Sequence, residues 1–248
     1  LFMCDGPHGL RKQENGADML GVHESREATC FPAEVTAAGS WDPELLEQIG
    51  AAIGEEAKDQ GVGLVLGPGA NLKRNPLCGR NFEYYSEDPL VAGEMAAAMV
   101  EGIQSEGVGA SLKHFACNNK ETNRKDSDSR VSERALREIY LKGFEICVKK
   151  AQPLTVMSSY NLLNGLWASQ NRELLTDILR GEWGFEGMVT TDWYTHAPQY
   201  TEIAAGNDVK MGCGDPAHTL KMMREGKLSR EDVKTSVKRL LEMILKLA

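Results

Sequence analysis

Short apolar runs that end on a polar or charged residue recur along the chain and set its organisation. Most of them are too continuous for a sheet with one solvated face, and such runs are typical of strands buried in a parallel sheet. The candidate strands are 1–5, 35–41, 62–66, 108–112, 154–158, 187–191 and 207–211. Most are followed by a polar loop and then by apolar residues at helical spacing, so the pattern predicts strands alternating with helices.

Capping residues mark where the helices begin. Asp42-Pro43 and Asp88-Pro89 each place an N-cap carboxylate before a proline at the first helical position. Ser229-x-x-Asp232 resembles a capping box before a final amphipathic stretch. The predicted helices cover about 43–60, Pro89 to Gly107, about 133–150 after Ser132, Asn171 to about Arg180, and the last segment through Leu245.

Repeated strand and helix units predict an α/β fold, most simply a (β/α)8 TIM-type barrel. A doubly wound open sheet is the competitor, but it gathers its ligand at one switch point, whereas here charged residues follow at least four strands. The chain begins almost on its first strand, so the barrel is expected to be incomplete at its N-terminal end. No GxGxxG or GxxxxGK[ST] motif follows a strand, so nucleotide binding has no support.

The charge balance narrows the class of partner. The 248 residues carry a formal net charge of −8 and a pI near 5.3, whereas nucleic acid or an anionic membrane calls for a basic surface. The chain also lacks an apolar run of about 18 residues. No nucleic-acid or membrane partner is therefore expected, and a neutral small molecule is the better fit.

Cysteine and histidine spacing argues against a metal. The six cysteines are widely spread without a CxxC pair, which favours free thiols in a reducing compartment, and no N-x-S/T sequon occurs. A cytoplasmic location is favoured on these grounds. Solvated or loop-bonding roles are expected for four histidines without ligand spacing, His8, His23, His196 and His218. We predict neither a metal nor a cofactor.

The stretch 187–194 holds the most informative acid. Asp192 ends an apolar strand pattern and precedes two aromatic residues, which places it at the strand's carboxyl end, where barrels carry their active sites. The alternative is an Asp that only caps a loop or helix. The other residues at strand ends or in the following loops are Asp5, Arg11, Arg80, Glu83, Lys113, His114, Arg124, Tyr160 and Trp193. Such a mixed-charge set with aromatic faces suits the hydroxyls and C–H face of a sugar ring.

Asp192 is therefore a candidate nucleophile acting on a sugar. A nucleophilic carboxylate must be ionised, so Arg80, Arg124 and Lys113 are expected to keep its pKa low. A retaining glycosidase also needs a second carboxyl group about 5–5.5 Å away to protonate the leaving oxygen. Glu83 is acidic, but it fits an ion pair with an arginine equally well. A Schiff-base role for Lys113, as in aldolase-type barrels, is conceivable but leaves the other strand-end residues without a role.

Four stretches resemble, in order, the signature segments of glycoside hydrolase family 3 β-glucosidases. They are Asp5-Gly-Pro-His-Gly-Leu-Arg11, Gly79-Arg80-Asn-Phe-Glu83-Tyr-Tyr-Ser-Glu-Asp-Pro89, Lys113-His114-Phe115 and Thr191-Asp192-Trp193. The resemblance implies that Asp192 is the nucleophile that forms a covalent glycosyl-enzyme, with Trp193 as an apolar wall. It also implies a set of residues that hold the sugar: Asp5, Arg11, Arg80, Lys113, His114, Arg124 and Tyr160.

The chain departs from that family's pattern in its acid/base. N-acetylglucosaminidase members carry a Lys-His-Phe-Pro-Gly-His-Gly loop, whereas here Lys113-His114-Phe115 runs into Ala116-Cys117-Asn118-Asn119. In the β-glucosidase branch the acid/base is a Glu in a separate α/β sandwich domain. Residues 1–248 are therefore expected to form the barrel domain alone. The acid/base is expected from a missing domain of the same polypeptide or from a partner chain.

The resemblance implies a retaining hydrolase that releases β-D-glucose from the non-reducing end of β-glucosides or cello-oligosaccharides. Two alternatives stay open. One is a β-xylosidase or other exo-glycosidase of the same family, and the other is a non-catalytic carbohydrate-binding barrel.

Overall fold

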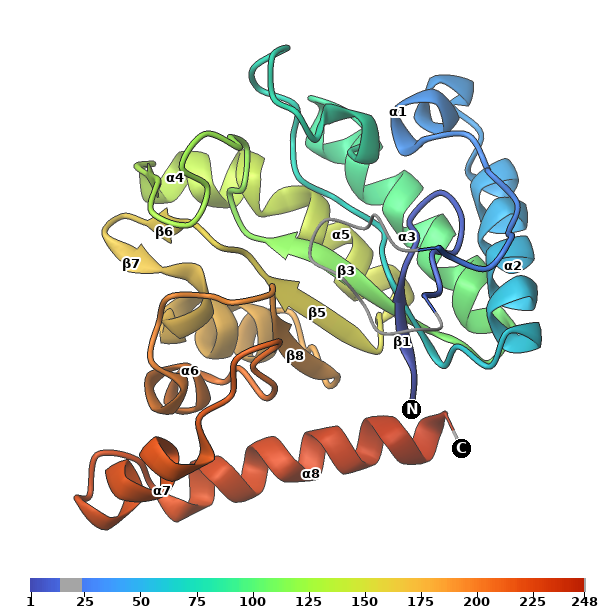
Figure 1. Ribbon diagram of the computed structural model, residues 1–248. Helices are drawn as coiled ribbons and strands as arrows, with labels where there is room; N and C mark the ends of the chain where they lie inside the picture. Colours follow the sequence, from blue (N-terminus) through green and yellow to red (C-terminus); the bar gives the residue numbers. More distant parts are fainter. Residues whose placement is uncertain (14–23, 248) are drawn as a thin grey trace.

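The centre of the molecule is a parallel sheet. The structure is a computed structural model that describes residues 1–13 and 24–247. Within these residues five strands pair in the order β1-β2-β3-β5-β8, and every pair is parallel (Figure 1). Their bounds are β1 Met3–Asp5, β2 Leu64–Leu66, β3 Gly109–Phe115, β5 Thr155–Ser158 and β8 Met188–Thr191. The predicted α/β class with a parallel sheet is confirmed, whereas the described strands form an open sheet between β1 and β8, not a closed barrel.

Strand register brings the predicted polar residues to one edge of this sheet. Asp5 lies opposite Leu66, Phe115 opposite Ser158, and Ser158 opposite Thr191. Because parallel strands all end at the same edge, the residues at or just beyond these positions are brought near one another.

Two strand predictions need correction. Residues 35–41 form helix α1, Glu34–Ala37, and a 3-10 turn η1, Ala38–Ser40, because the amides of Thr36 and Ala37 bond back to the Ala33 carbonyl at 2.8 and 2.9 Å. The segment 207–211 lies against β8 and bridges to it between Thr190 and Val209, but it is not a strand. A small second sheet was not foreseen, and its strands are β4 Asp128–Ser129, β6 Leu162–Leu163 and β7 Leu166–Trp167.

Most predicted helices are present with the predicted caps. Asp42 and Asp88 accept amide hydrogen bonds at the starts of α2 and α3, and Ser229 does so at α8. The predicted helix 133–150 is instead three consecutive pieces, with a π-helical middle. The helical segments are α2 Pro43–Asp59, η2 Asn81–Glu83, α3 Pro89–Ser105, α4 Glu133–Ala135, η3 Leu136–Tyr140, α5 Lys142–Ala151, η4 Ala168–Gln170, η5 Glu173–Glu182, α6 Gln199–Ala205, α7 Pro216–Arg224 and α8 Arg230–Lys246.

Helices α2 and α3 pack with their backbones in close approach. A Cβ atom at Gly50 would lie 2.5 Å from the carbonyl oxygen of Met99. A Cβ atom at Gly102 would overlap the carbonyl oxygen of Glu47 and lie 2.8 Å from the amide nitrogen of Ala51. Only glycine fits at these two contacts, so the sequence fixes how closely the two helices approach.

A buried carboxylate ties α8 to the sheet. Asp208 has no exposed side-chain surface; it accepts from the Val189 amide of β8 at 2.8 Å and pairs with Arg180 at 2.9 Å and Arg239 at 3.2 Å. Because Arg239 belongs to α8 and Arg180 to η5, one side chain joins three elements.

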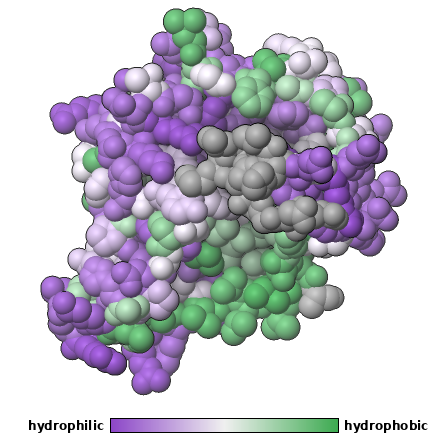
Figure 2. Space-filling view, in the orientation of Figure 1, coloured by the Kyte–Doolittle hydropathy of each residue, from purple (hydrophilic) through white to green (hydrophobic). Residues whose placement is uncertain are grey.

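Polar and apolar surfaces are segregated on the face seen in Figure 2. Apolar residues gather at the lower part of that view, near the end of α8 and the start of the chain. Leu1 and Phe2, at the start of the chain, and Leu241 and Leu245, on α8, are exposed apolar residues. Among the helices that the structure describes, none has both the length and the apolar character needed to cross a membrane. The six cysteines are free thiols.

Candidate active site

Lys113 is the centre of an ion-pair network at the strand ends. Its ammonium lies 2.9 Å from Asp5 Oδ1 and 3.6 Å from Glu83 Oε2, and Glu83 Oε1 also accepts from Arg80 Nε. Burial lowers the pKa of Lys113, but the carboxylates of Asp5 and Glu83 outweigh it and raise the net pKa. Desolvation raises the pKa of Asp5 only in part, because more than half of its side chain is exposed, and Lys113 and Arg80 lower the net pKa of its carboxyl. The network therefore holds charged groups in fixed positions.

His114 is a neutral ring with a defined tautomer. Burial, followed by the charges of Arg80, Lys113 and Arg124, lowers its pKa well below the usual value. Arg80 Nη2 lies 2.7 Å from Nε2 and can only donate, so Nε2 is an acceptor, and the proton sits on Nδ1 toward the Tyr84 hydroxyl at 3.2 Å. A neutral imidazole at 3.8 Å from Asp192 Oδ2 makes no ion pair with it.

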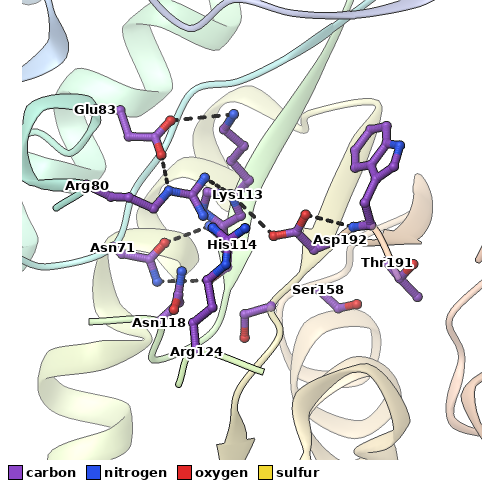
Figure 3. Close-up of polar contacts among 12 residues, drawn as sticks. Asn71, Arg80, Glu83, Lys113, His114, Asn118, Arg124, Ser158, Thr191 and Asp192 are labelled. Carbon is purple, nitrogen blue, oxygen red and sulfur yellow. Dashed lines mark hydrogen bonds and ion pairs between the residues drawn. The ribbon is translucent and has the colours of Figure 1, made fainter. Parts of the chain in front are cut away.

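The two oxygens of Asp192 have different surroundings. Oδ1 accepts from the Trp193 amide at 2.8 Å, whereas Oδ2 is buried and has no hydrogen-bond partner among residues 1–13 and 24–247. Figure 3 shows the side chains of Arg80, His114 and Asp192 converging from different elements. Asp192 thus presents one fixed and one free oxygen at the end of β8, and the first amide after it holds its orientation.

The expectation of a low pKa at Asp192 is wrong. Burial raises the pKa of its carboxyl above the ordinary 3.8, and this effect exceeds the lowering by Arg80, the Trp193 amide, Tyr160 and Lys113. The side chain is only 10% exposed, so the loss of hydration outweighs the nearby cations.

The remaining predicted residues lie in different relations to this centre. Tyr160 is buried, with the Arg124 guanidinium 4.8 Å from its ring centroid, and Arg124 also pairs with Glu121 at 3.1 Å. Trp193 is partly buried against the apolar cluster Leu64, Leu66 and Met157. Arg11 is placed through its backbone, whose amide bonds to the Asp5 carbonyl at 2.9 Å.

Several residues that support this site were missed from sequence. Asn71 brackets the His114 backbone, donating to its carbonyl at 2.8 Å and accepting from its amide at 2.7 Å. Tyr84 orients the His114 ring, and Glu121 holds Arg124. The available signal was a lone polar residue, Asn71, inside the otherwise apolar or glycine-rich run 62–72.

Two alternative assignments lose support. Both oxygens of Glu83 are engaged with Arg80 and Lys113, as the ion-pair interpretation expected, so Glu83 is not free to protonate a leaving group. Lys113 is charged, with a raised pKa, whereas a Schiff-base lysine needs an unprotonated amine.

The isolated histidines and Arg130 make local contacts. Arg130 pairs with Asp128 at 2.9 Å, and His196 contacts Asp126 at 2.9 Å. His8 lies 3.4 Å from the buried Glu34, and His23 lies outside the described residues. In the part of the chain that the structure describes, no group of three or more potential ligands could hold a metal ion.

The fold and this site define a class of protein. A parallel sheet whose strand ends gather a buried carboxylate, cations and aromatic rings is the arrangement of α/β enzymes with their site at the carboxyl edge. The comparison with protein families identifies the member of that class. The chain belongs to the family described as glycosyl hydrolase family 3 N terminal domain, which matches residues 16–243.

Similar proteins agree with this family. Thermostable beta-glucosidase B of Acetivibrio thermocellus is 49% identical over 247 residues, covering 98% of this chain and 33% of that protein. An exo-alpha-(1->6)-L-arabinopyranosidase of Bifidobacterium breve is 47% identical over 250 residues, covering 99% of this chain and 33% of its own length. The solved structure of beta-glucosidase 3B from Thermotoga neapolitana in complex with alpha-D-glucose has a TM-score of 0.92 and 48% identity, covering 98% of this chain and 35% of that one. The chain thus spans about a third of the length of these relatives.

Proposed function

We propose that this chain is the nucleophile-bearing domain of a retaining glycoside hydrolase that releases β-D-glucose from the non-reducing end of β-glucosides or cello-oligosaccharides. The free Oδ2 of Asp192, set at the end of a parallel strand and backed by Arg80 and His114, carries the proposal. The two relatives named beta-glucosidase support the substrate class.

In the proposed reaction Asp192 Oδ2 attacks the anomeric carbon while the bond to the leaving oxygen breaks. The leaving alcohol takes a proton from a general acid, and water then releases the sugar from Asp192 with the same group acting as base. The Trp193 amide keeps the carboxylate aimed throughout, since it holds Oδ1. Arg80 supplies positive charge beside the carboxylate.

The sugar itself would be held by the polar residues around Asp192. Asp5 and Lys113 form one pair that can accept and donate toward hydroxyls far from the anomeric carbon. His114 Nε2 can accept from a hydroxyl in place of Arg80, and Trp193 offers an apolar face. Arg11, Arg124 and Tyr160 complete the set that we assign to substrate binding.

We further propose that residues 1–248 are the barrel domain of a longer polypeptide, with the (β/α)8 barrel completed by segments beyond those described. The open sheet and the greater length of the relatives support this division. The general acid/base would come from the α/β sandwich domain or from a partner chain, since Glu83 is engaged in ion pairs.

Covalent labelling tests the nucleophile in the intact polypeptide. A 2-fluoro glucoside is expected to inactivate the enzyme and to label the peptide containing Asp192, because the fluorine slows hydrolysis of the glycosyl-enzyme. Asp192→Asn should abolish turnover and labelling, whereas Glu242→Gln, which removes only an exposed ion pair with Lys238, should still be labelled. A label on another residue contradicts the assignment. Glucose binding without turnover or labelling would instead support the carbohydrate-binding alternative.

A second candidate activity follows from one relative. The protein of Bifidobacterium breve is named for action on α-L-arabinopyranosides and is nearly as similar as the beta-glucosidases. The ratio of kcat/KM for aryl β-D-glucoside, aryl β-D-xyloside and aryl α-L-arabinopyranoside separates the candidates. A preference for β-D-glucoside supports the main proposal.

A further inference from the structure

The loop that follows β8 carries two elements of the proposed site. Residues 193–198 include Trp193, whose ring we assign to the sugar wall and whose amide holds Asp192 at 2.8 Å. The next residue, Tyr194, has a φ of 59°, in the left-handed region that residues with a side chain rarely adopt. A loop with this conformation keeps its shape only when its surroundings hold it.

The side-chain ammonium of Lys210 binds that loop. Its ammonium donates to the Thr195 carbonyl at 3.0 Å, the Thr195 hydroxyl at 2.9 Å and the Ala197 carbonyl at 2.8 Å. It also reaches Glu202 Oε2 at 3.0 Å, on helix α6. A single side chain therefore binds backbone atoms on both sides of His196 and joins them to the next helix.

The network around this ammonium is buried and hydrogen-bonded. The side chains of Lys210 and Glu202 are 6% and 2% exposed. The second oxygen of Glu202 accepts from the hydroxyls of Ser169 and Thr195, both at 2.8 Å. A buried ion pair adds little stability over an apolar pair of the same volume, so its main effect is to fix geometry.

The segment that carries Lys210 also packs against the loop. The Tyr194 amide donates to the Met211 carbonyl at 3.1 Å. The Tyr194 ring covers Gly212, where a Cβ atom would lie 2.9 Å from Cζ. The same segment bonds to β8 through the Thr191 amide and the Val209 carbonyl at 2.9 Å. The segment that carries Lys210 therefore contacts both loop 193–198 and strand β8.

We propose that Lys210 is a positioning residue for the reaction: through the Thr195 and Ala197 carbonyls it fixes loop 193–198, and so sets the Trp193 wall and the amide that aims Asp192. Lys210 touches neither the sugar nor the reacting atoms. This inference rests on the proposed function, because it gives the loop a role in sugar binding.

The test uses the intact polypeptide with the variants Lys210→Met and Lys210→Met/Glu202→Gln. The double variant removes both charges, so no unpaired charge is left buried, and it carries the test if Lys210→Met alone does not fold. We expect kcat/KM for an aryl β-glucoside to fall about 10- to 100-fold in both, as displaced positioning groups cause. Lys142→Met, which removes an exposed ion pair with Glu145, is the control and should leave kcat/KM unchanged.

A double-mutant cycle shows whether Lys210 acts through Trp193. In a Trp193→Ala background, which removes the ring but keeps the amide, Lys210→Met/Glu202→Gln should lower kcat/KM by a smaller factor than in the wild-type background, since coupled sites are not additive. An undiminished effect in that background, or wild-type kcat/KM in the double variant, overturns the proposal.

Hydrogen exchange gives a readout independent of activity. The amides of residues 192–197 should exchange faster in the double variant, while peptides over β5 keep their wild-type rates. Unchanged exchange in the loop overturns the inference even if the proposed function holds. If the double variant exchanges faster but the wild-type protein hydrolyses no aryl glycoside, Lys210 holds the loop and the proposed function fails.

Discussion

At the scale of single residues, Asp192 combines two requirements that oppose each other. Attack on a sugar needs an ionised carboxylate, but burial favours the protonated acid and raises the pKa above 3.8. The cations and the Trp193 amide offset part of this cost. A carboxylate stripped of water in this way is less stabilised and so more reactive toward an electrophile.

The raised pKa predicts the acidic limb of the pH profile. Asp192 loses its proton only as the pH rises through its own pKa, so the active form is lost on acidification at a pH above 3.8. The profile of kcat/KM on an aryl glucoside, measured in the intact enzyme, reports this value. Incubation at each pH followed by assay at neutral pH controls for denaturation. A limb at or below 3.8 would contradict the effect of burial.

The sequence could predict which residues gather at the site but not their electrostatics. Asp192, Lys113 and His114 could be found because each follows an apolar strand and matches a family motif. The neutral state of His114 depends first on burial and then on nearby cations such as Arg80, whose Nη2 lies 2.7 Å from the ring, and the pKa of Asp192 depends on burial. Both arise from distant segments meeting in space, which local patterns do not encode.

At the scale of elements, close helix packing turns two glycines into steric requirements. Helix propensity alone favours alanine over glycine inside a helix by about 1 kcal/mol. At Gly102 the new methyl group would meet the backbone of Glu47 and Ala51 on α2, so packing and propensity oppose each other.

Gly102→Ala is therefore expected to destabilise the protein by about 1–3 kcal/mol, as overpacking does. Gly181→Ala, in η5, is the matched control, because its nearest neighbour would be the Thr176 carbonyl oxygen at an ordinary 3.5 Å. That change should be neutral or stabilising by up to about 1 kcal/mol. Thermal or denaturant unfolding of both variants provides the comparison. Equal stability of the two would argue against the close approach of α2 and α3.

Element predictions succeeded where capping and periodicity agreed. Helices α2 and α3 begin at their Asp-Pro pairs, and β5 and β8 fall on the expected apolar runs. The strand prediction for residues 35–41 was wrong because a short apolar run does not distinguish a strand from a helix. Local amide hydrogen bonds to the Ala33 carbonyl make this segment helical. No pattern in the sequence predicted that segments 136–140 and 173–182 would be π-helical and not α-helical.

At the scale of the whole molecule, the candidate site is assembled from segments spread over most of the chain. Asp5 follows from β1, Arg80 from the loop before α3, Lys113 and His114 from β3, and Asp192 from β8. The repeated strand and helix units predicted a (β/α)8 barrel, but the five described strands form an open sheet, because the pattern along a chain does not encode whether the two edge strands pair with each other.

The unequal surroundings of the two Asp192 oxygens have a consequence for inhibition. Asp5 and Glu83 already share the positive charge of Lys113, whereas Asp192 Oδ2 has no cationic hydrogen-bond partner in the described chain; Tyr160 and the neutral His114 ring lie beside the carboxylate. A glucose-shaped ring with a protonated nitrogen at the anomeric position would supply that partner through a charge-assisted hydrogen bond. Its inhibition constant should tighten as the pH rises through the pKa of Asp192, until the amine itself loses its proton. An affinity no better than that of glucose at every pH would show that this oxygen is not available. If the inhibition constant does tighten over this pH range, the site selects cations that have the shape of a sugar.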